Sequence, residues 1–213
     1  MNISSYIDHT LLKSFATDKE LIKLCSEAKK YSFKSVCVNP CDVAFCKKQL
    51  EGSGVLVCTV IGFPLGKNKT EIKVEETRLA LIDGADEFDM VINVAKLKER
   101  DLAFVESEIK AVINACKGKT VKVIIESGLL TDEEIALATQ IVCKAGANFV
   151  KTCTGFTGGV ATESAVKIMK QNLSGKTLIK ASGGIKTYEQ AVNFINLGVS
   201  RIGTSSGVEI VNG

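Results

Sequence analysis

The chain has 213 residues, of which 46% are hydrophobic and 24% charged, a composition typical of a globular protein with a sizeable core. Its net charge of +3, from 27 basic and 24 acidic residues, is too small to indicate binding to nucleic acid or to an anionic membrane, although it permits a local basic pocket for a phosphate. The N-terminus lacks the basic and then apolar order of a signal peptide, and no apolar run reaches the roughly 18 residues of a membrane-spanning helix. We therefore expect a cytoplasmic protein.

Eight cysteines and a single histidine, His9, bear on possible disulfide and metal sites. Most of the cysteines lie inside predicted strands and helices, where cysteine behaves as a small hydrophobic residue, and the chain is not a short secreted one. Cys37, Cys41 and Cys46 lack the C-x-x-C spacing of a zinc site. We therefore expect neither a disulfide framework nor a bound metal.

Short β-branched runs alternate with segments of helical periodicity along the whole chain. The predicted strands span residues 6–9, 35–38, 55–61, 87–93, 121–126, 149–153, 178–181 and 201–203. The predicted helices span residues 18–31, 41–50, 69–83, 102–116, 132–145, 162–171 and 188–197. Capping boxes mark three helix starts, at Thr17–Glu20, Thr131–Glu134 and Thr187–Gln190. Glycines that suit helix C-caps precede three strands, at Gly84, Gly146 and Gly198.

Eight strands alternating with helices over about 200 residues predict a (β/α)8 TIM barrel, a single domain that spans residues 1–213. An open, doubly wound sheet is the main alternative. No G-x-G-x-x-G follows the first clear strand and the alternation never breaks into two halves, which favours the barrel. Only residues 208–213 follow Gly207, so a full closing helix does not fit.

Polar side chains near the C-terminal ends of the strands are the candidates for chemistry, because barrel active sites form at that end. Strand alternation places Asp89 and Asn93 on one face, and Lys122 and Glu126 on one face of the next strand. Parity alone does not say which face is inward. The other candidates at the strand ends are Cys37, Asn39, Lys151, Lys180, Thr204, Ser205 and Ser206.

Two lysines inside apolar strands, Lys151 and Lys180, indicate amine chemistry. A single lysine in a strand is most simply a water-facing edge residue, but the pattern recurs in what are predicted to be successive strands. An ordinary lysine, with a pKa of about 10.4, is less than about 0.1% neutral at pH 7, so an attacking amine has to be activated. A second cation nearby or a dry pocket lowers a lysine pKa, and a drop of 3 units requires about 4 kcal/mol. An aspartate such as Asp89, with a water, then moves protons.

Small and glycine-rich turns follow the last three predicted strands, at residues 154–155, 182–184 and 203–207. Free backbone N–H groups near helix N-termini form an anion cradle, and a phosphate site after strands seven and eight recurs in barrels. Turn geometry alone would also explain each glycine. Three adjacent clusters nevertheless favour a phosphate site.

Eight motifs carry a resemblance to a known family. They are IDHTLL (7–12), SVCVNP (35–40), VIGFPLG (60–66), GADEFDMV (84–91), KVIIE (122–126), FVKTCTG (149–155), IKASGGI (179–185) and RIGTSSG (201–207). Over nearly its whole length the chain resembles the deoxyribose-phosphate aldolases, which are class I aldolases of deoxynucleoside breakdown.

The resemblance implies a role for each matching residue. Lys151 corresponds to the Schiff-base lysine, Lys180 to the partner that perturbs it, and Asp89 to the proton donor and acceptor that works with a water. The residues that correspond to the phosphate site are Gly155, Gly183, Gly184, Gly203, Ser205 and Ser206. Further residues that correspond to the active-site lining are Cys37, Asp8 and Lys122.

The implied reaction is the reversible cleavage of 2-deoxy-D-ribose 5-phosphate into acetaldehyde and D-glyceraldehyde 3-phosphate. The iminium serves as the electron sink, so the resemblance implies no metal and no organic cofactor. It also implies a homo-oligomer, either a dimer or a tetramer. Two other interpretations stay open: another phosphate-binding barrel lyase or isomerase, and a barrel that binds a sugar phosphate without catalysis.

Overall fold

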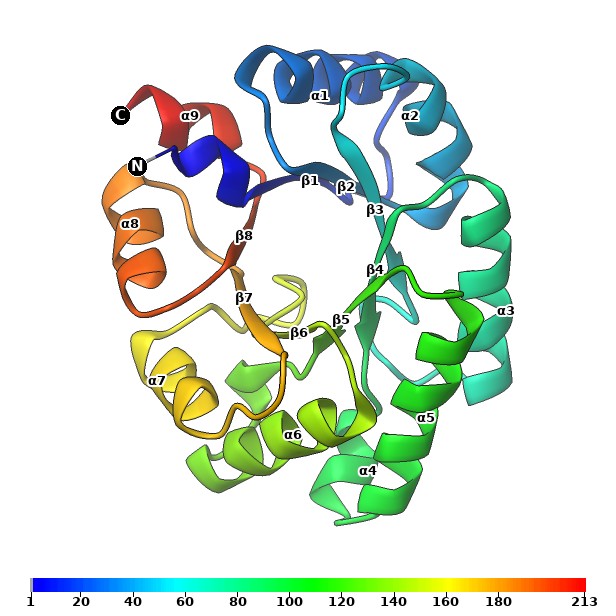
Figure 1. The fold of residues 1–213 in the computed structure, drawn as a ribbon, viewed down its shortest axis with the longest axis vertical. Coiled ribbons are helices and arrows are strands. Elements are labelled where there is room, and N and C mark those ends of the chain that lie inside the picture. The colour runs from blue at the N-terminus through cyan, green and yellow to red at the C-terminus, as the bar shows by residue number, and fades with distance from the viewer. Residues whose placement is uncertain (1) are drawn as a thin grey trace.

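Eight parallel strands close into a barrel in the computed structural model, which describes residues 2–213 (Figure 1). The strands pair in chain order, and β8 pairs with β1 to close the sheet. Their bounds are β1 (Ile7–Leu11), β2 (Ser35–Val38), β3 (Leu56–Ile61), β4 (Glu87–Val91), β5 (Thr120–Ile124), β6 (Phe149–Lys151), β7 (Leu178–Ser182) and β8 (Arg201–Thr204). The predicted (β/α)8 barrel is confirmed, and the open sheet is excluded.

Helices surround the barrel, as Figure 1 shows. The α-helices are α1 (Asp18–Tyr31), α2 (Val43–Gln49), α3 (Thr70–Ile82), α4 (Val94–Lys98), α5 (Leu102–Ala115), α6 (Asp132–Ala145), α7 (Glu163–Gln171), α8 (Tyr188–Asn196) and α9 (Gly207–Asn212). Three short 3₁₀ helices are η1 (Ile3–Tyr6), η2 (Pro40–Asp42) and η3 (Ser127–Leu129). The prediction missed α4 and α9. The short helix α9 has six residues and follows β8.

Local signals in the sequence set several helix ends. All three predicted capping boxes form, at the starts of α1, α6 and α8. Gly84, Gly146 and Gly198 adopt φ of 100°, 86° and 103° at the ends of α3, α6 and α8. Glycine reaches this left-handed region without the steric cost that a Cβ imposes, so each helix turns sharply into the next strand.

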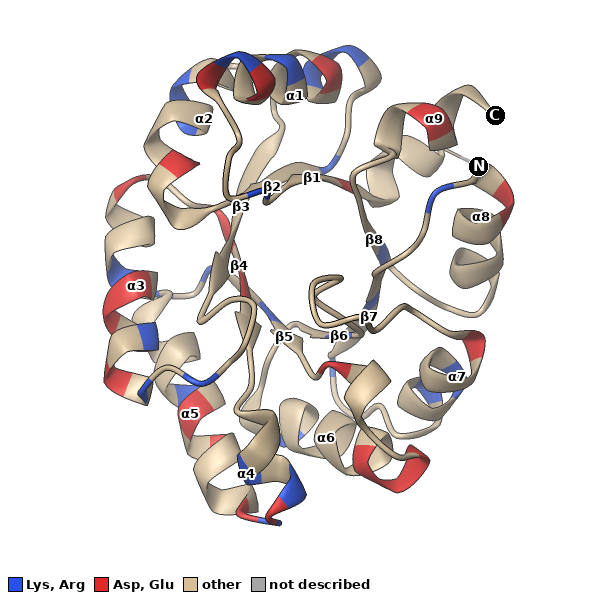
Figure 2. Ribbon diagram, turned by 180° about the vertical axis from the view of Figure 1, so that it is seen from behind, with Lys and Arg blue, Asp and Glu red and all other residues tan. Residues whose placement is uncertain are grey.

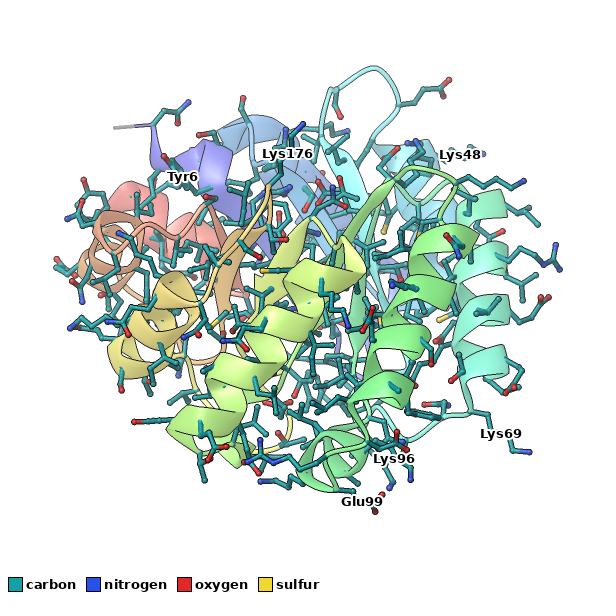
Figure 3. All side chains as sticks on the ribbon, turned by 60° about the horizontal axis from the view of Figure 1, so that its bottom comes forward. Tyr6, Lys48, Lys69, Lys96, Glu99 and Lys176 are labelled. Carbon is teal, nitrogen blue, oxygen red and sulfur yellow. The ribbon has the colours of Figure 1, made fainter. Side chains whose placement is uncertain are left out.

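The main apolar core lies between the strands and the helix layer. Alternation along each strand divides the side chains, so Phe88 and Met90 of β4 join this core while Asp89 between them faces the barrel interior. Charged side chains cover the outside, where Lys48, Lys69 and Glu99 point into solvent (Figure 3). Within residues 2–213, no helix combines the length and the apolar character needed to cross a membrane.

A second, smaller apolar group lies apart from the main core. Its buried members are Leu12, Cys37, Cys58 and Val60, and Phe63 packs against them from the loop after β3. We call these five residues the inner apolar cluster. Cys37 and Cys58 are register partners on β2 and β3. The inner apolar cluster therefore borders the side chains that the neighbouring strands point into the barrel.

Candidate active site

Seven charged side chains form one network inside the barrel. They come from six strands, and the strand ribbons in Figure 2 carry both charge colours. The members are Asp8 (β1), Glu87 and Asp89 (β4), Lys122 (β5), Lys151 (β6), Lys180 (β7) and Arg201 (β8). Each is at most 4% exposed. Buried charges are tolerated only when they are paired and hydrogen-bonded. The strands therefore have to place acidic and basic residues beside one another.

Asp89 is the centre of this network. Its Oδ2 accepts hydrogen bonds from Nζ of Lys151 and Nζ of Lys180, both at 2.7 Å. Its Oδ1 accepts from Nζ of Lys122 at 2.8 Å and from the thiol of Cys58 at 3.1 Å. Burial raises the pKa of Asp89, but the three ammonium groups outweigh burial and hold it well below the ordinary value. Asp89 is therefore ionised at neutral pH and acts as an acceptor.

The remaining carboxylates hold the other cations in place. Lys180 donates to Asp8 Oδ2 at 2.5 Å, and Arg201 bridges Asp8 Oδ1 at 2.6 Å and Glu87 Oε1 at 2.5 Å. Lys122 lies 2.7 Å from Glu87 Oε2. Burial lowers the pKa of Lys180, but the carboxylates beside it hold that pKa above its ordinary value, and the same balance raises the pKa of Lys122. Burial raises the pKa of Asp8, yet Lys180, Lys122 and Arg201 bring it below its ordinary value.

The charges of the network do not balance. Four basic side chains face three carboxylates, so the network has one positive charge in excess when every group is ionised. Arg201 keeps its proton, and Lys122 and Lys180 each contact at least two carboxylates. Within residues 2–213, Lys151 has a single acceptor, Asp89 Oδ2. Lys151 is therefore the basic member of the network that the fewest carboxylate contacts hold.

A cavity of about 240 Å³ opens beside Lys151, at the C-terminal ends of β6, β7, β8 and β1. Lys151 lines it and is 4% exposed, whereas Lys122 and Lys180 are fully buried. Of the residues expected to bind phosphate, those in its wall are Gly155, Gly183, Gly184, Gly203 and Ser205. Ser206 lies outside the wall, and its backbone N–H donates to Thr204 Oγ1 at 2.9 Å.

The three other expected lining residues lie deeper. Asp8, Lys122 and Cys37 are at most 1% exposed and are not in the cavity wall. Asp8 and Lys122 contact other members of the network, and Cys37 belongs to the inner apolar cluster. Their place in the structure suits positioning of the reactive groups better than direct contact with a ligand.

Several residues of the site escaped the sequence analysis. Glu87 and Arg201 complete the network, and Cys58 contacts Asp89. The spacing of Glu87 and Asp89, two residues apart on one strand, was an available signal for a shared face. Lys13 and Lys186 line the cavity with cationic side chains, but both lie in loops, where periodicity gives no information.

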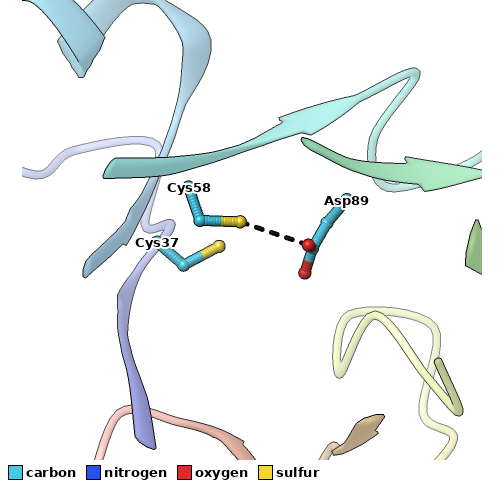
Figure 4. Close-up of side chains that lie close together, drawn as sticks. All are labelled: Cys37, Cys58 and Asp89. Atoms are coloured by element: carbon cyan, nitrogen blue, oxygen red, sulfur yellow. Dashed lines mark hydrogen bonds between the residues drawn. The ribbon is translucent and has the colours of Figure 1, made fainter. Parts of the chain in front are cut away.

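Cys37, Cys58 and Asp89 place one potential metal-ligand atom each within 4.8 Å of one another (Figure 4). Two observations argue against a metal there. Nζ of Lys122 lies 3.1 Å from Cys58 Sγ and 2.8 Å from Asp89 Oδ1, so an ammonium already neutralises these atoms. Burial also raises the pKa of Cys58 well above its ordinary value, whereas a thiol ligand has to be deprotonated. The group therefore fits a protonated thiol better than a metal ligand set.

Comparisons with known proteins identify the family of this chain. The sequence pattern of the DeoC/LacD family aldolases matches residues 3–212. The deoxyribose-phosphate aldolase of Finegoldia magna is 55% identical over 213 residues, and that of Treponema denticola is 51% identical over 215 residues, with full coverage of all chains. The tetrameric deoxyribose phosphate aldolase of Aeropyrum pernix superposes with a TM-score of 0.90 at 33% identity, covering 99% of this chain and 89% of that one. The chain therefore belongs to the DeoC/LacD family of aldolases.

Proposed function

We propose that this protein reversibly cleaves 2-deoxy-D-ribose 5-phosphate into acetaldehyde and D-glyceraldehyde 3-phosphate, through a Schiff base on Lys151. Curated relatives at 51–55% identity have the name deoxyribose-phosphate aldolase. The observation that carries the proposal is the position of Lys151. It is the one lysine of the interior network that lines the cavity, and it has the fewest acceptors. A neutral amine beside a cavity is what Schiff-base formation requires.

Cleavage begins at the aldehyde of the open-chain sugar. Nζ of neutral Lys151 attacks C1, and the carbinolamine loses water to give an iminium. The bond between C2 and C3 then breaks, its electron pair moves toward the iminium nitrogen, and the C3 hydroxyl gives up its proton. D-glyceraldehyde 3-phosphate leaves, and an enamine remains on Lys151. Protonation of the enamine carbon and hydrolysis of the new iminium release acetaldehyde and regenerate the amine.

Asp89 is the group that we assign to proton transfer. Its Oδ2 lies 2.7 Å from Nζ of Lys151, within the reach of a general base, directly or through one water. Its depressed pKa keeps it ionised as the acceptor in the resting enzyme. Lys180, which contacts the same oxygen, holds that carboxylate in place and keeps a positive charge beside the amine.

The glycine-rich turns around the cavity suit the substrate phosphate. Gly183 and Gly184 adopt φ of 100° and 76°, and a Cβ at Gly184 would approach the side chain of Val160 within 3.0 Å. Glycine is therefore the residue that fits these turns, and backbone N–H groups in such turns can bind an anion. Lys186 and Lys13, which line the same cavity, add positive charge. A phosphate held there fixes the aldehyde carbon relative to Lys151, which lowers the entropic cost of reaction.

Borohydride trapping tests the proposed function. The purified protein is incubated with acetaldehyde, reduced with borohydride, digested and mapped by mass spectrometry. We expect a two-carbon adduct on Lys151, with release of acetaldehyde from 2-deoxyribose 5-phosphate in a coupled assay. The Lys151→Met variant is the matched control and should give neither. Absence of an adduct on Lys151 in the active protein would rule out the Schiff-base assignment, and sugar-phosphate binding without acetaldehyde release would indicate a non-catalytic barrel.

The same proposal places the protein in the cytoplasm, in the breakdown of deoxyribonucleotides. It also expects a homo-oligomer, because a relative with 33% identity is described as tetrameric. Sedimentation of the purified protein gives the oligomeric state directly. A monomer at working concentration would contradict that expectation without affecting the proposed chemistry.

A further inference from the structure

A second pair of buried charges lies outside the barrel, between α3, α5 and the end of β4. Lys73 of α3 is fully buried and Glu108 of α5 is 1% exposed, and Lys73 Nζ lies 2.8 Å from Glu108 Oε1. A buried ion pair is a weak source of stability, because desolvation offsets the attraction of the two charges. The pair is therefore a candidate for a positioning role.

The ammonium of Lys73 joins three separate segments. Besides Glu108, it donates to the backbone carbonyl of Gly66 at 2.9 Å and to that of Val91 at 2.8 Å. An ammonium has three donors, so each N–H has one acceptor. The second oxygen of Glu108 accepts the backbone N–H of Asn93 at 3.1 Å. The pair thus ties the loop after β3 to the end of β4 and to the start of α4.

The loop that Lys73 holds is a tight turn over residues 62–66. The N–H of Gly66 donates to the carbonyl of Gly62 at 2.8 Å, and the N–H of Gly62 donates to Glu76 Oε2 at 2.7 Å. A Cβ at Gly62 would lie 2.7 Å from Cε of Lys73, and one at Gly66 would lie 2.0 Å from the carbonyl oxygen of Ile92. Lys73 and Glu76 of α3 therefore fix the two ends of the turn, and no side chain fits at either glycine.

This turn presents Phe63 to the site. Phe63 packs against the four buried members of the inner apolar cluster, of which Cys58 contacts Asp89. Its ring also meets the ring of Phe156 edge to face, with centroids 5.1 Å apart and an interplanar angle of 80°. Phe156 and Leu12 line the cavity beside Lys151. Phe63 therefore connects the apolar groups beside Asp89 with the cavity wall.

We propose that the buried Lys73–Glu108 pair is a positioning device for the reaction, which holds the 62–66 turn so that Phe63 shields the reacting enamine from water. The inference rests on the proposed Schiff-base function. Protonation of the enamine carbon completes cleavage, but in the synthetic direction a carbon that takes a proton before it attacks D-glyceraldehyde 3-phosphate returns to the iminium and is hydrolysed to acetaldehyde. That event returns the donor aldehyde without forming the carbon–carbon bond. Phe63 suppresses it by supporting Phe156 in the cavity wall, which limits the water that reaches the intermediate.

The test measures how much of the enamine forms the carbon–carbon bond and how much is protonated instead. Acetaldehyde and D-glyceraldehyde 3-phosphate are mixed with enzyme in D₂O. Formation of 2-deoxyribose 5-phosphate and incorporation of deuterium into the acetaldehyde methyl group are followed together by NMR. The double variant Lys73→Met/Glu108→Leu removes both charges and avoids leaving one of them unpaired. We expect its ratio of carbon–carbon bond formation to deuterium incorporation to fall by about tenfold or more, since a misplacement of about 1 Å can cost roughly 100-fold.

Three further variants separate positioning from general loss of stability. Phe63→Ala should lower the same ratio with the ion pair intact. Glu108→Gln keeps the shape of the side chain and should lower the ratio less than the double variant does. If the double variant does not fold, Glu108→Gln provides the test. Val112→Ala, a truncation in the main core on α5, should weaken folding and leave the ratio unchanged.

The outcomes distinguish this inference from the function on which it rests. An unchanged ratio in the ion-pair variants would overturn the positioning role, whatever Phe63→Ala does. An equal fall in Val112→Ala would also overturn it, because the effect would then follow stability alone. Absence of deuterium incorporation and of a borohydride adduct in the wild type would instead overturn the proposed function.

Discussion

The network inside the barrel and the Lys73–Glu108 pair outside it are both buried, yet their charges balance differently. Outside the barrel, one ammonium contacts one carboxylate and two carbonyls, so all three of its N–H groups have acceptors. Inside the barrel, four basic groups face three carboxylates, and Lys151 shares its single acceptor oxygen with Lys180. Only Lys151 of these interior lysines reaches the cavity.

The difference shows how one fold places buried charges for two purposes. In a balanced pair, an ammonium whose three N–H groups all have acceptors serves to hold segments together. A network with one excess cation leaves one basic group with fewer acceptors than the others, and that group is Lys151. Reactivity is therefore expected at Lys151, and positional order at Lys73.

The largest expected effect follows from Lys151→Met. Turnover should fall by at least about 10⁴-fold, because the covalent intermediate no longer forms. The free energy of unfolding should stay within about 1 kcal/mol of the wild type, since the substitution removes the excess charge and Asp89 keeps Lys122 and Lys180 as partners. Steady-state kinetics and urea unfolding measure the two quantities. A large loss of stability would contradict the charge balance that we describe.

Lys73→Met should have the opposite effect: a large loss of stability with the chemistry on Lys151 retained. It leaves Glu108 buried without its cation, which typically costs about 3–5 kcal/mol of unfolding free energy. The borohydride adduct on Lys151 should still form in the folded fraction. Urea unfolding of Lys73→Met beside Lys151→Met, the same substitution in the two regions, provides the matched comparison. Equal destabilisation by the two substitutions would show that the two sets of charges do not differ as proposed.

Most of the fold was predictable because its signals are local. Capping boxes and helical periodicity gave α1 and α6 their observed bounds, Asp18–Tyr31 and Asp132–Ala145. The five residues of α4, Val94–Lys98, are too few to show a period, and only the Asn93 cap marks them. Strand ends were less certain, and β6 ends at Lys151, two residues before the predicted end. Pairing with β5 and β7, which the sequence does not display, sets that end.

The candidate site was predictable in part, for a related reason. A lysine in an apolar strand is conspicuous, so Lys151 and Lys180 stood out from the sequence. Lys73 did not, because it lies on a helix among Lys69, Glu75 and Glu76, where a charge usually faces water. Its burial depends on the loop after β3 folding over α3 and on Glu108 arriving from α5. Such contacts join segments up to 35 residues apart, and no local pattern specifies them.

The carboxyl groups of the interior network should make the stability of the protein sensitive to acid. The pKa of Asp8 and that of Asp89 lie below their ordinary values in the folded protein, so between the folded and unfolded pKa values the unfolded chain binds more protons. Stability from these two carboxyls is then present above about pH 4 and is lost as pH falls below it, because the unfolded chain takes up protons first. Urea unfolding between pH 3 and pH 7 measures this slope. Asp8→Asn should flatten it, and Asp42→Asn, at a half-buried carboxyl of η2 outside the network, should not.

The prediction with the smallest change in free energy tests the charge excess inside the barrel most directly. Lys180→Met removes one cation from the network, so three basic groups face three carboxylates and the positive charge beside the reacting amine is lost. The profile of kcat/KM against pH should move upward by about one unit or more, or about 1.4 kcal/mol, with lower activity at pH 7. Lys73→Met is the matched control, because it also removes a buried cation but lies outside the network; its profile should keep its position. If both variants leave the profile in place, excess charge inside the barrel does not set the protonation of the reactive amine.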